Sequence, residues 1–206
     1  MSRAIGPASI EPDWPSSSTT AAIARGADAG DMAGMLNALH TLPQMTIALV
    51  HGAAMAGGCG LLSACDMAIA TKSASFALSE VRLGIIPAVI SPYVIRAIGP
   101  RAASRYFLTA ERFDAATAHA LGLVHMVVED NDALAKEAEK LVQQVFTCAP
   151  GAVDAAKDLI RAVEGRPIDS HIMADTSRRI AERRASDEAK EGLSAFLEKR
   201  KPKWAE

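Results

Sequence analysis

The sequence predicts an α/β fold that is followed by an entirely helical C-terminal region. Two short apolar runs rich in β-branched residues, at 46–50 and 66–70, have the composition of strands that are buried on both faces. From residue 131 onward, apolar residues recur at helical spacing instead. With 206 residues, half of them apolar, the chain is long enough to bury a core without disulfides or metal ions.

The first thirty residues predict no packed structure. They are rich in Ala, Ser, Thr, Pro and Gly and show no sustained hydrophobic period, which is typical of a loop or a disordered leader. Residues 1–20 contain a single basic residue, Arg3, and no continuous apolar stretch, so they do not resemble a signal peptide. We therefore expect a leader over 1–30, an α/β core over 31–130 and a helical region over 131–206.

A strand, a glycine turn and a short helix open the predicted core. Residues 57–60 read Gly-Gly-Cys-Gly, and residues 57–64 can form about two turns of helix between the two strands. A third extended segment is expected at 75–78. Residues 37–65 carry no formal charge, but His51, Pro43 and the glycines divide this run, so it does not predict a membrane span.

Helical periods follow residue 87. Helices are expected at 88–98 and 101–108, separated by Gly99-Pro100, and at 114–121, where Asp114 can cap the helix. A last strand is expected at 123–128.

The C-terminal region predicts amphipathic helices. One apolar stripe consists of Leu134, Ala138, Leu141, Val142, Val145 and Phe146. The final helix, at about 187–199, repeats this spacing, with Ser186 as a cap and basic residues at its negative end.

Charge and cysteine content argue against several classes of protein. The net charge of −2 and the pI of about 6.2 leave no basic excess for nucleic acid. The three cysteines form no Cys-x-x-Cys pair, and we expect them to be reduced and buried, as in a cytoplasmic protein. The five histidines are scattered without metal-ligand spacing, so no metal site is expected.

The glycine turn allows two interpretations. It follows a strand and opens a helix, where backbone N–H groups at the positive helix end can bind negative charge. One interpretation is dinucleotide binding, because Gly58, Gly60 and Ser63 approach the G-x-G-x-x-G pattern. However, the first glycine comes too late after the strand. The other interpretation is an oxyanion hole, in which preorganised donors stabilise charge on a thioester carbonyl.

Several motifs favour the oxyanion hole, because together they resemble the crotonase (enoyl-CoA hydratase/isomerase) family. They occur in the family's order at 39–43 (LHTLP), 46–60 (TIALVHGAAMAGGCG), 64–66 (ACD), 75–87 (SFALSEVRLGIIP) and 191–200 (EGLSAFLEKR). The resemblance covers about residues 35–202. It implies a stack of ββα turns, a helical oligomerisation region that forms trimers or hexamers, and an acyl-CoA substrate, with no cofactor beyond the coenzyme A of that substrate.

The resemblance also implies roles for single residues. The N–H of Gly57 matches an oxyanion donor, and Glu80 matches a catalytic glutamate. The alternative for Glu80 is a solvated carboxylate paired with Arg82. Phe196 and Lys199 match positions that contact coenzyme A, often across a subunit boundary, although as bare residues they fit a helix's apolar stripe and basic end equally well.

The chain departs from the family pattern at Gly60, where a hydratase usually carries a second glutamate. A single glutamate at the position of Glu80 resembles the family's enoyl-CoA isomerases. Against this, residues 86–93 (IPAVISPY) and 106–113 (YFLTAERF) resemble the branch that handles methylglutaconyl-CoA and related branched acyl-CoAs, which tolerates glycine at this position. Hydration therefore remains the predicted activity, in preference to isomerisation.

A second departure concerns the N-terminal part of the family fold. The family places a strand-helix-strand segment and an Ala-Gly-Ala-Asp-Leu turn, which holds the other oxyanion donor, well upstream. We interpret residues 24–28 (ARGAD) as a chance likeness to that turn, so the core is expected to be incomplete and the oxyanion hole to have one donor.

These observations predict an enoyl-CoA hydratase that acts on a 2-enoyl or branched acyl-CoA, with a role in fatty acid or leucine breakdown. One alternative is an enoyl-CoA isomerase that uses Glu80 alone. The other is a catalytically impaired fragment that acts only in assembly.

Overall fold

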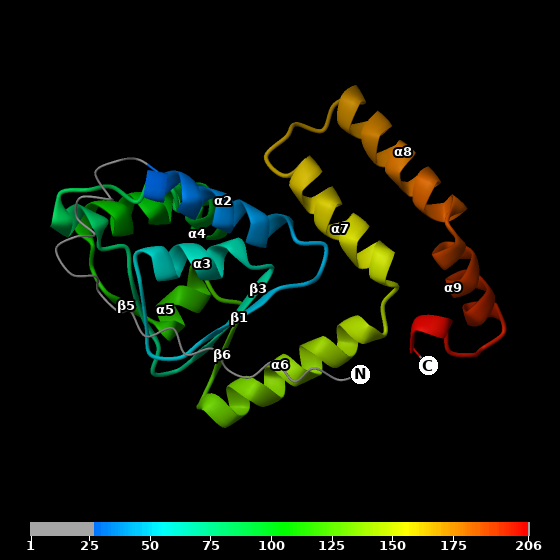
Figure 1. The fold of residues 1–206 in the computed structure, drawn as a ribbon, viewed down its shortest axis with the longest axis horizontal. Coiled ribbons are helices and arrows are strands. Elements are labelled where there is room, and N and C mark those ends of the chain that lie inside the picture. Colours follow the sequence, from blue (N-terminus) through cyan, green and yellow to red (C-terminus); the bar gives the residue numbers. More distant parts are fainter. Residues whose placement is uncertain (1–26, 206) are drawn as a thin grey trace.

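The computed structural model describes residues 27–205 of the chain. Figure 1 shows an α/β unit that contains the strands of the described chain, and a run of helices, α6 to α9, of which α6 packs along this unit and α7 to α9 extend away from it. In chain order the elements are α2 (Ala27–Thr41), β1 (Ile47–Val50), β2 (Ala53–Met55), α3 (Gly57–Ala64), β3 (Met67–Thr71), β4 (Ser75–Ala77), the 3₁₀ turn η1 (Glu80–Leu83), α4 (Ser91–Thr109), β5 (Phe113–Asp114), α5 (Ala115–Ala120), β6 (Met126–Val128), α6 (Asn131–Phe146), α7 (Pro150–Val163), α8 (Ser170–Ala185), α9 (Asp187–Leu197) and the 3₁₀ turn η2 (Lys203–Ala205).

The strands form two small sheets, and the first four strands alternate between them. One sheet has the order β1-β3-β6 and is parallel throughout. The other has the order β2-β4-β5, in which β2 and β4 are parallel and β5 is antiparallel. The pairs β1–β2 and β3–β4 thus each send one strand to each sheet, and α3 joins the two pairs. This succession confirms the predicted α/β class with ββα turns.

Strand β2 was not expected from the sequence. Its residues, Ala53–Met55, lie in the stretch interpreted as part of the glycine turn, yet Met55 pairs with Ala77 of β4. Alanine has a low strand propensity, so the strand exists because of this non-local partner.

One hydrophobic core lies between the sheets and the helices that cover them. Its largest fully buried side chains include Leu36 of α2, Phe76 of β4 and Val94 of α4. Phe76 stacks on Phe113 with ring centroids 5.6 Å apart. Full burial of such a side chain stabilises the fold by about 1.5–3 kcal/mol. Helix α2 therefore belongs to the core, and it already includes Ala27, four residues before Asp31, where order was expected to begin. The rest of the predicted leader lies outside the described residues.

The helix boundaries largely follow the predicted local signals. The Asp114 carboxylate accepts a hydrogen bond from the Thr117 N–H at 2.8 Å, and the Ser186 hydroxyl accepts one from the Ala189 N–H at 3.2 Å. Gly99, with φ 73° and ψ 161°, breaks α4 where two helices were expected. Strand β6 begins only at Met126, three residues later than predicted, after the buried residues 123 and 124.

The C-terminal helices expose much of the apolar surface that their predicted stripes contain. On α6, Leu134 is buried, whereas Phe146 is 65% exposed. On α9, Leu193 and Leu197 are 61% and 78% exposed. The prediction that all three cysteines are buried is wrong for Cys148, which is exposed. Within residues 27–205, no helix combines the length and the apolar character that crossing a membrane requires.

Polar contacts fasten α7 to the α/β unit. Lys157 is only 8% exposed, and its ammonium group donates to the Gln44 carbonyl at 2.6 Å and to the Asp66 carboxylate at 2.7 Å. Asp66 also accepts from the N–H and the hydroxyl of Thr46, at 2.7 and 2.9 Å. Nearby, Arg161 donates to the His40 carbonyl at 3.3 Å. This charged junction connects the start of β1, the start of β3 and the middle of α7.

Candidate active site

Gly57 and Glu80 lie just beyond the ends of two neighbouring strands. Met55 ends β2 and Ala77 ends β4, and these two residues are register partners in a parallel pair. The chain then enters α3 at Gly57 and the 3₁₀ turn η1 at Glu80. The carboxyl ends of parallel strands meet at one edge of a sheet, which is where α/β proteins place their sites. The fold therefore brings the two predicted catalytic residues to the same edge.

The backbone at Ala56 aims the Gly57 N–H out of the helix. Ala56 has φ 47° and ψ −113°, its N–H donates to the Ala77 carbonyl at 2.8 Å, and its carbonyl accepts from Cys59 and Gly60 at 2.9 and 3.3 Å. In a trans peptide the carbonyl and the following N–H point in opposite directions. Because the Ala56 carbonyl points into the helix, the Gly57 N–H points away from its N-terminal end.

The first two N–H groups of α3 remain open. Neither Gly57 nor Gly58 donates a backbone hydrogen bond to any residue in the described part of the chain, as expected for the first turn of a helix. The positive φ of Ala56 costs on the order of 1–3 kcal/mol. Such strain persists only where the surroundings enforce it, and here it leaves two donors free at the positive end of α3.

Glu80 is a buried carboxyl group that lacks a full set of partners. The residue is 8% exposed, and its Oε2 is buried without a hydrogen-bond partner among residues 27–205. Burial raises the pKa of the Glu80 carboxyl, and a hydrogen bond from its own N–H opposes this in part. An orphaned buried oxygen with a raised pKa is typical of a group that exchanges protons with a substrate.

The alternative assignment of Glu80 as a solvated carboxylate paired with Arg82 is wrong. The ion pairs of the described residues include none between these two side chains, and Glu80 is buried while Arg82 is exposed. A structural role as a surface ion pair is therefore excluded for Glu80.

Cys59 supports this edge in a way that the sequence did not indicate. Its side chain is fully buried, and its thiol donates to the Ala54 carbonyl of β2 at 3.1 Å and lies 3.6 Å from the Ala77 carbonyl of β4. Burial, with a smaller contribution from the charge of Glu80, raises the pKa of the Cys59 thiol to about 12. The group is therefore a neutral donor that ties α3 to both strands, and not a nucleophile.

Phe196 and Lys199 lie far from this edge. Phe196, near the end of α9, is 80% exposed, and Lys199 follows the helix with φ 55°. Figure 1 places α9 at the end of the helical run, on the far side of α7 from the α/β unit. A single chain therefore brings together Gly57 and Glu80 but not the two predicted coenzyme A contacts.

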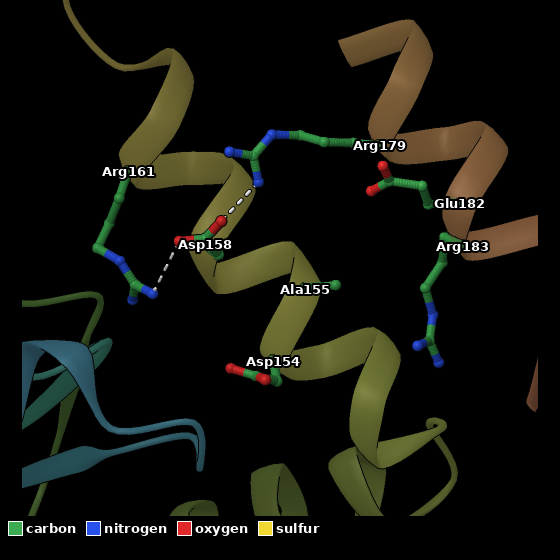
Figure 2. Close-up of a pocket in the computed structure, with 7 residues that line it drawn as sticks. All are labelled: Asp154, Ala155, Asp158, Arg161, Arg179, Glu182 and Arg183. Carbon is green, nitrogen blue, oxygen red and sulfur yellow. Dashed lines mark hydrogen bonds and ion pairs between the residues drawn. The ribbon is translucent and has the colours of Figure 1, made fainter. Parts of the chain in front are cut away.

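A cleft between α7 and α8 is built from compensating charges. It has a volume of about 470 Å³ and is lined by Asp154, Ala155, Asp158, Arg161, Arg179, Glu182 and Arg183. Figure 2 shows the guanidinium groups of Arg161 and Arg179 both reaching the Asp158 carboxylate, at 3.4 and 2.5 Å. The arginines of this cleft are thus largely neutralised by neighbouring carboxylates. The cleft lies between two helices of the helical run, apart from Glu80. Residues 27–205 contain no group of three or more side chains placed to hold a metal ion.

Comparison with known proteins identifies the family. The sequence model of the enoyl-CoA hydratase/isomerase family matches residues 24–206. A putative enoyl-CoA hydratase of Thermus thermophilus is 34% identical over 170 residues, which are 82% of this chain and 66% of that protein. A carnitinyl-CoA dehydratase of Citrobacter koseri is 35% identical over 181 residues, 85% of this chain and 68% of that protein.

A solved structure agrees with the sequence comparisons. An enoyl-CoA hydratase from Shewanella pealeana superposes with a TM-score of 0.83 at 44% identity, over 92% of this chain and 69% of that one. The chain therefore spans about two thirds of the length of the proteins it matches.

Proposed function

The chain belongs to the enoyl-CoA hydratase/isomerase family, the crotonases, and we propose that it adds water across the double bond of a 2-enoyl-CoA thioester. The observation that carries the proposal is that one sheet edge holds both the buried Glu80 carboxyl, whose Oε2 has no partner among the described residues, and the open Gly57 N–H.

The proposed chemistry needs both groups. As a water molecule adds its oxygen to Cβ, the Glu80 carboxylate takes a proton from it, and electron density moves from the double bond to the thioester oxygen. The Gly57 N–H stabilises the enolate-like charge on that oxygen. The Glu80 carboxyl then returns the proton to Cα, so one carboxyl group serves as base and then as acid. Burial favours this role, because a pKa raised toward neutrality suits proton transfer in both directions.

The proposed substrate is a 2-enoyl-CoA or a branched enoyl thioester such as methylglutaconyl-CoA. The segment that follows Glu80 presents three apolar side chains to solvent, Leu83, Ile85 and Ile86, which are 67%, 53% and 72% exposed. An apolar acyl group lying against them would remove this surface from water, which stabilises binding by about 25 cal/mol per Å². The likeness of residues 86–93 and 106–113 to the branched acyl-CoA enzymes supports the same substrate class.

A second candidate function is isomerisation of the acyl double bond through Glu80 alone. It is favoured by the finding that Glu80 is the only buried carboxylate within residues 27–205. Moving a double bond requires one base to carry a proton from one carbon to another, whereas hydration must also position a water molecule.

We propose that the protein acts as a cytoplasmic homo-oligomer, a trimer or hexamer, assembled through its C-terminal helices. The exposed apolar side chains of α6 and α9 support this, because surface of that extent on a helical run is typical of an interface. In such an assembly, Phe196 and Lys199 of one subunit would contact coenzyme A held by another. The remaining possibility, a fragment that acts only in assembly, predicts an oligomer without turnover.

Product analysis tests the proposed function. Purified protein is incubated with crotonyl-CoA, 3-methylglutaconyl-CoA and a 3-enoyl-CoA, and its mass in solution is measured by light scattering. A hydratase converts the first two into 3-hydroxyacyl-CoA products and consumes their ultraviolet absorbance. Formation of 2-enoyl-CoA from the 3-enoyl substrate, without hydration, would instead establish the isomerase. A folded oligomer with no turnover of any substrate would leave only the assembly role.

A further inference from the structure

Gly60, one turn along α3 from Gly57, has no room for any side chain. A Cβ atom added to it would lie 2.2 Å from Cγ2 of Ile90, 2.8 Å from its Cβ and 3.7 Å from its Cα. Atoms without a bond between them do not approach this closely, since carbon atoms pack at about 3.5–4.0 Å. Ile90 itself is 2% exposed and belongs to the core.

The position of Ile90 is fixed from its C-terminal side. It directly precedes α4 with φ −85° and ψ −17°, and its carbonyl accepts from the N–H groups of Tyr93 and Val94 at 3.1 and 3.0 Å. The neighbouring Ser91 hydroxyl donates to the Ala88 carbonyl at 2.8 Å. Because the backbone is tied into the start of a helix, a side chain at position 60 could not push Ile90 aside by moving a loop.

Position 60 lies at the edge where Gly57 and Glu80 meet. Residues three apart on a helix share a face, and the N–H of Gly60 donates to the same Ala56 carbonyl whose orientation points the Gly57 N–H outward. The residue before it, Cys59, has its thiol 3.6 Å from the carbonyl of Ala77, the last residue of β4, and Glu80 follows three residues later. A side chain at position 60 would therefore stand at the same strand edge as Glu80, in space that Ile90 now fills.

We propose that Ile90 keeps Glu80 the sole carboxyl group at this edge by occupying the volume that a side chain at position 60 needs. Ile90 reaches the chemistry only through position 60, so it is a positioning residue and not a catalytic one. The proposal rests on the proposed function, but the steric conflict between a side chain at position 60 and Ile90 can be tested without measuring turnover.

The test is a set of double variants analysed by thermal unfolding. Gly60→Ala is made in the wild-type chain and in chains that carry Ile90→Val, Ile90→Ala or Ile90→Gly. In wild type the added methyl group overpacks the core, and we expect the melting temperature to fall by about 5 °C. Ile90→Val is the matched control, because valine keeps both the Cβ and a methyl group at the Cγ2 position.

The expected pattern is a reversal of sign. In the Ile90→Gly chain the clash is gone, and Gly60→Ala should raise the melting temperature by about 2–3 °C, since alanine is the better helix former. In the Ile90→Val chain, Gly60→Ala should lower the melting temperature as much as in wild type. In the Ile90→Ala chain, which retains a Cβ, it should lower the melting temperature less. This chain keeps the comparison interpretable if Ile90→Gly unfolds. An equal effect of Gly60→Ala in all backgrounds would overturn the proposal.

The functional half is read from pH profiles of kcat/KM with crotonyl-CoA. Wild type and Ile90→Val should show one ionising carboxyl group, and Gly60→Glu combined with Ile90→Gly should show a second. A single ionisation in that double variant would overturn the placement of position 60 at the same edge as Glu80. Absence of turnover in wild type would refute the proposed hydratase function, while the unfolding data would still decide the role of Ile90.

Discussion

Replacing Lys157 with methionine should weaken the attachment of α7 to the α/β unit and so lower the free energy of unfolding. Methionine keeps the unbranched shape of the buried side chain but removes the ammonium group that contacts Asp66 and the Gln44 carbonyl. Because Lys157 is 8% exposed, water cannot replace these contacts without a rearrangement.

The expected loss follows from what remains around Asp66. Removing one member of a buried ion pair typically costs about 3–5 kcal/mol, because the other charge stays buried without compensation. Here the Asp66 side chain is 24% exposed and keeps two donors from Thr46. We therefore expect a loss of about 2–3 kcal/mol, close to that of a hydrogen bond to a charged group. For a chain of this size this lowers the melting temperature by about 4–12 °C.

Thermal and urea unfolding of Lys157→Met measure this loss. Lys140→Met is the matched control, because Lys140 also pairs with a carboxylate but its side chain is 65% exposed, and exposed pairs contribute little. If Lys157→Met unfolds no more easily than Lys140→Met, the junction does not hold α7 in the way the contacts indicate.

Three further predictions concern Glu80, Ala56 and the cysteines. Burial raises the pKa of Glu80 in the folded chain, so the stability linked to this group is complete below the ordinary pKa of a glutamate and is lost as the pH rises through the raised pKa. Glu80→Gln should therefore melt higher than wild type at pH 8 but not at pH 4, and equal differences at both pH values would contradict this. Ala56→Gly should increase the free energy of unfolding by up to about 1 kcal/mol, as measured in urea, because glycine accepts the positive φ of this position; a decrease would show that the turn is not strained. Iodoacetamide should modify the exposed Cys148 first and leave Cys59 unmodified, because burial raises the Cys59 pKa to about 12; mass spectrometry that finds Cys59 labelled in the folded protein would contradict this.

Local signals in the sequence predicted the elements that depend on local interactions. The caps at Asp114 and Ser186 and the break at Gly99 formed where their residue types indicated. Strand β2 was missed because its residues have no strand propensity, and it forms only by pairing with β4, twenty-two residues along the chain. A pairing of this kind cannot be read from a short window of sequence.

The candidate site was predicted in part for the same reason. The family motifs indicated Gly57 and Glu80, and the register of β2 and β4 places them together. The contact between Gly60 and Ile90, thirty residues apart, and the hydrogen bonds of Cys59 left no pattern in the sequence. The apolar stripe of α6 indicated a buried face, but an amphipathic pattern does not say whether the covering surface belongs to the same chain.

The most direct test of the proposed mechanism is the rate of crotonyl-CoA hydration by wild type and by Glu80→Gln, with Glu111→Gln as the control. Glu111 is a glutamate whose carboxylate is paired with Arg105. Glutamine keeps the size of Glu80 but cannot transfer protons, so the account predicts a loss of about 10²–10⁴-fold in kcat, with Glu111→Gln unchanged. Hydration by Glu80→Gln at the wild-type rate would contradict the assignment of Glu80 as the acid and base.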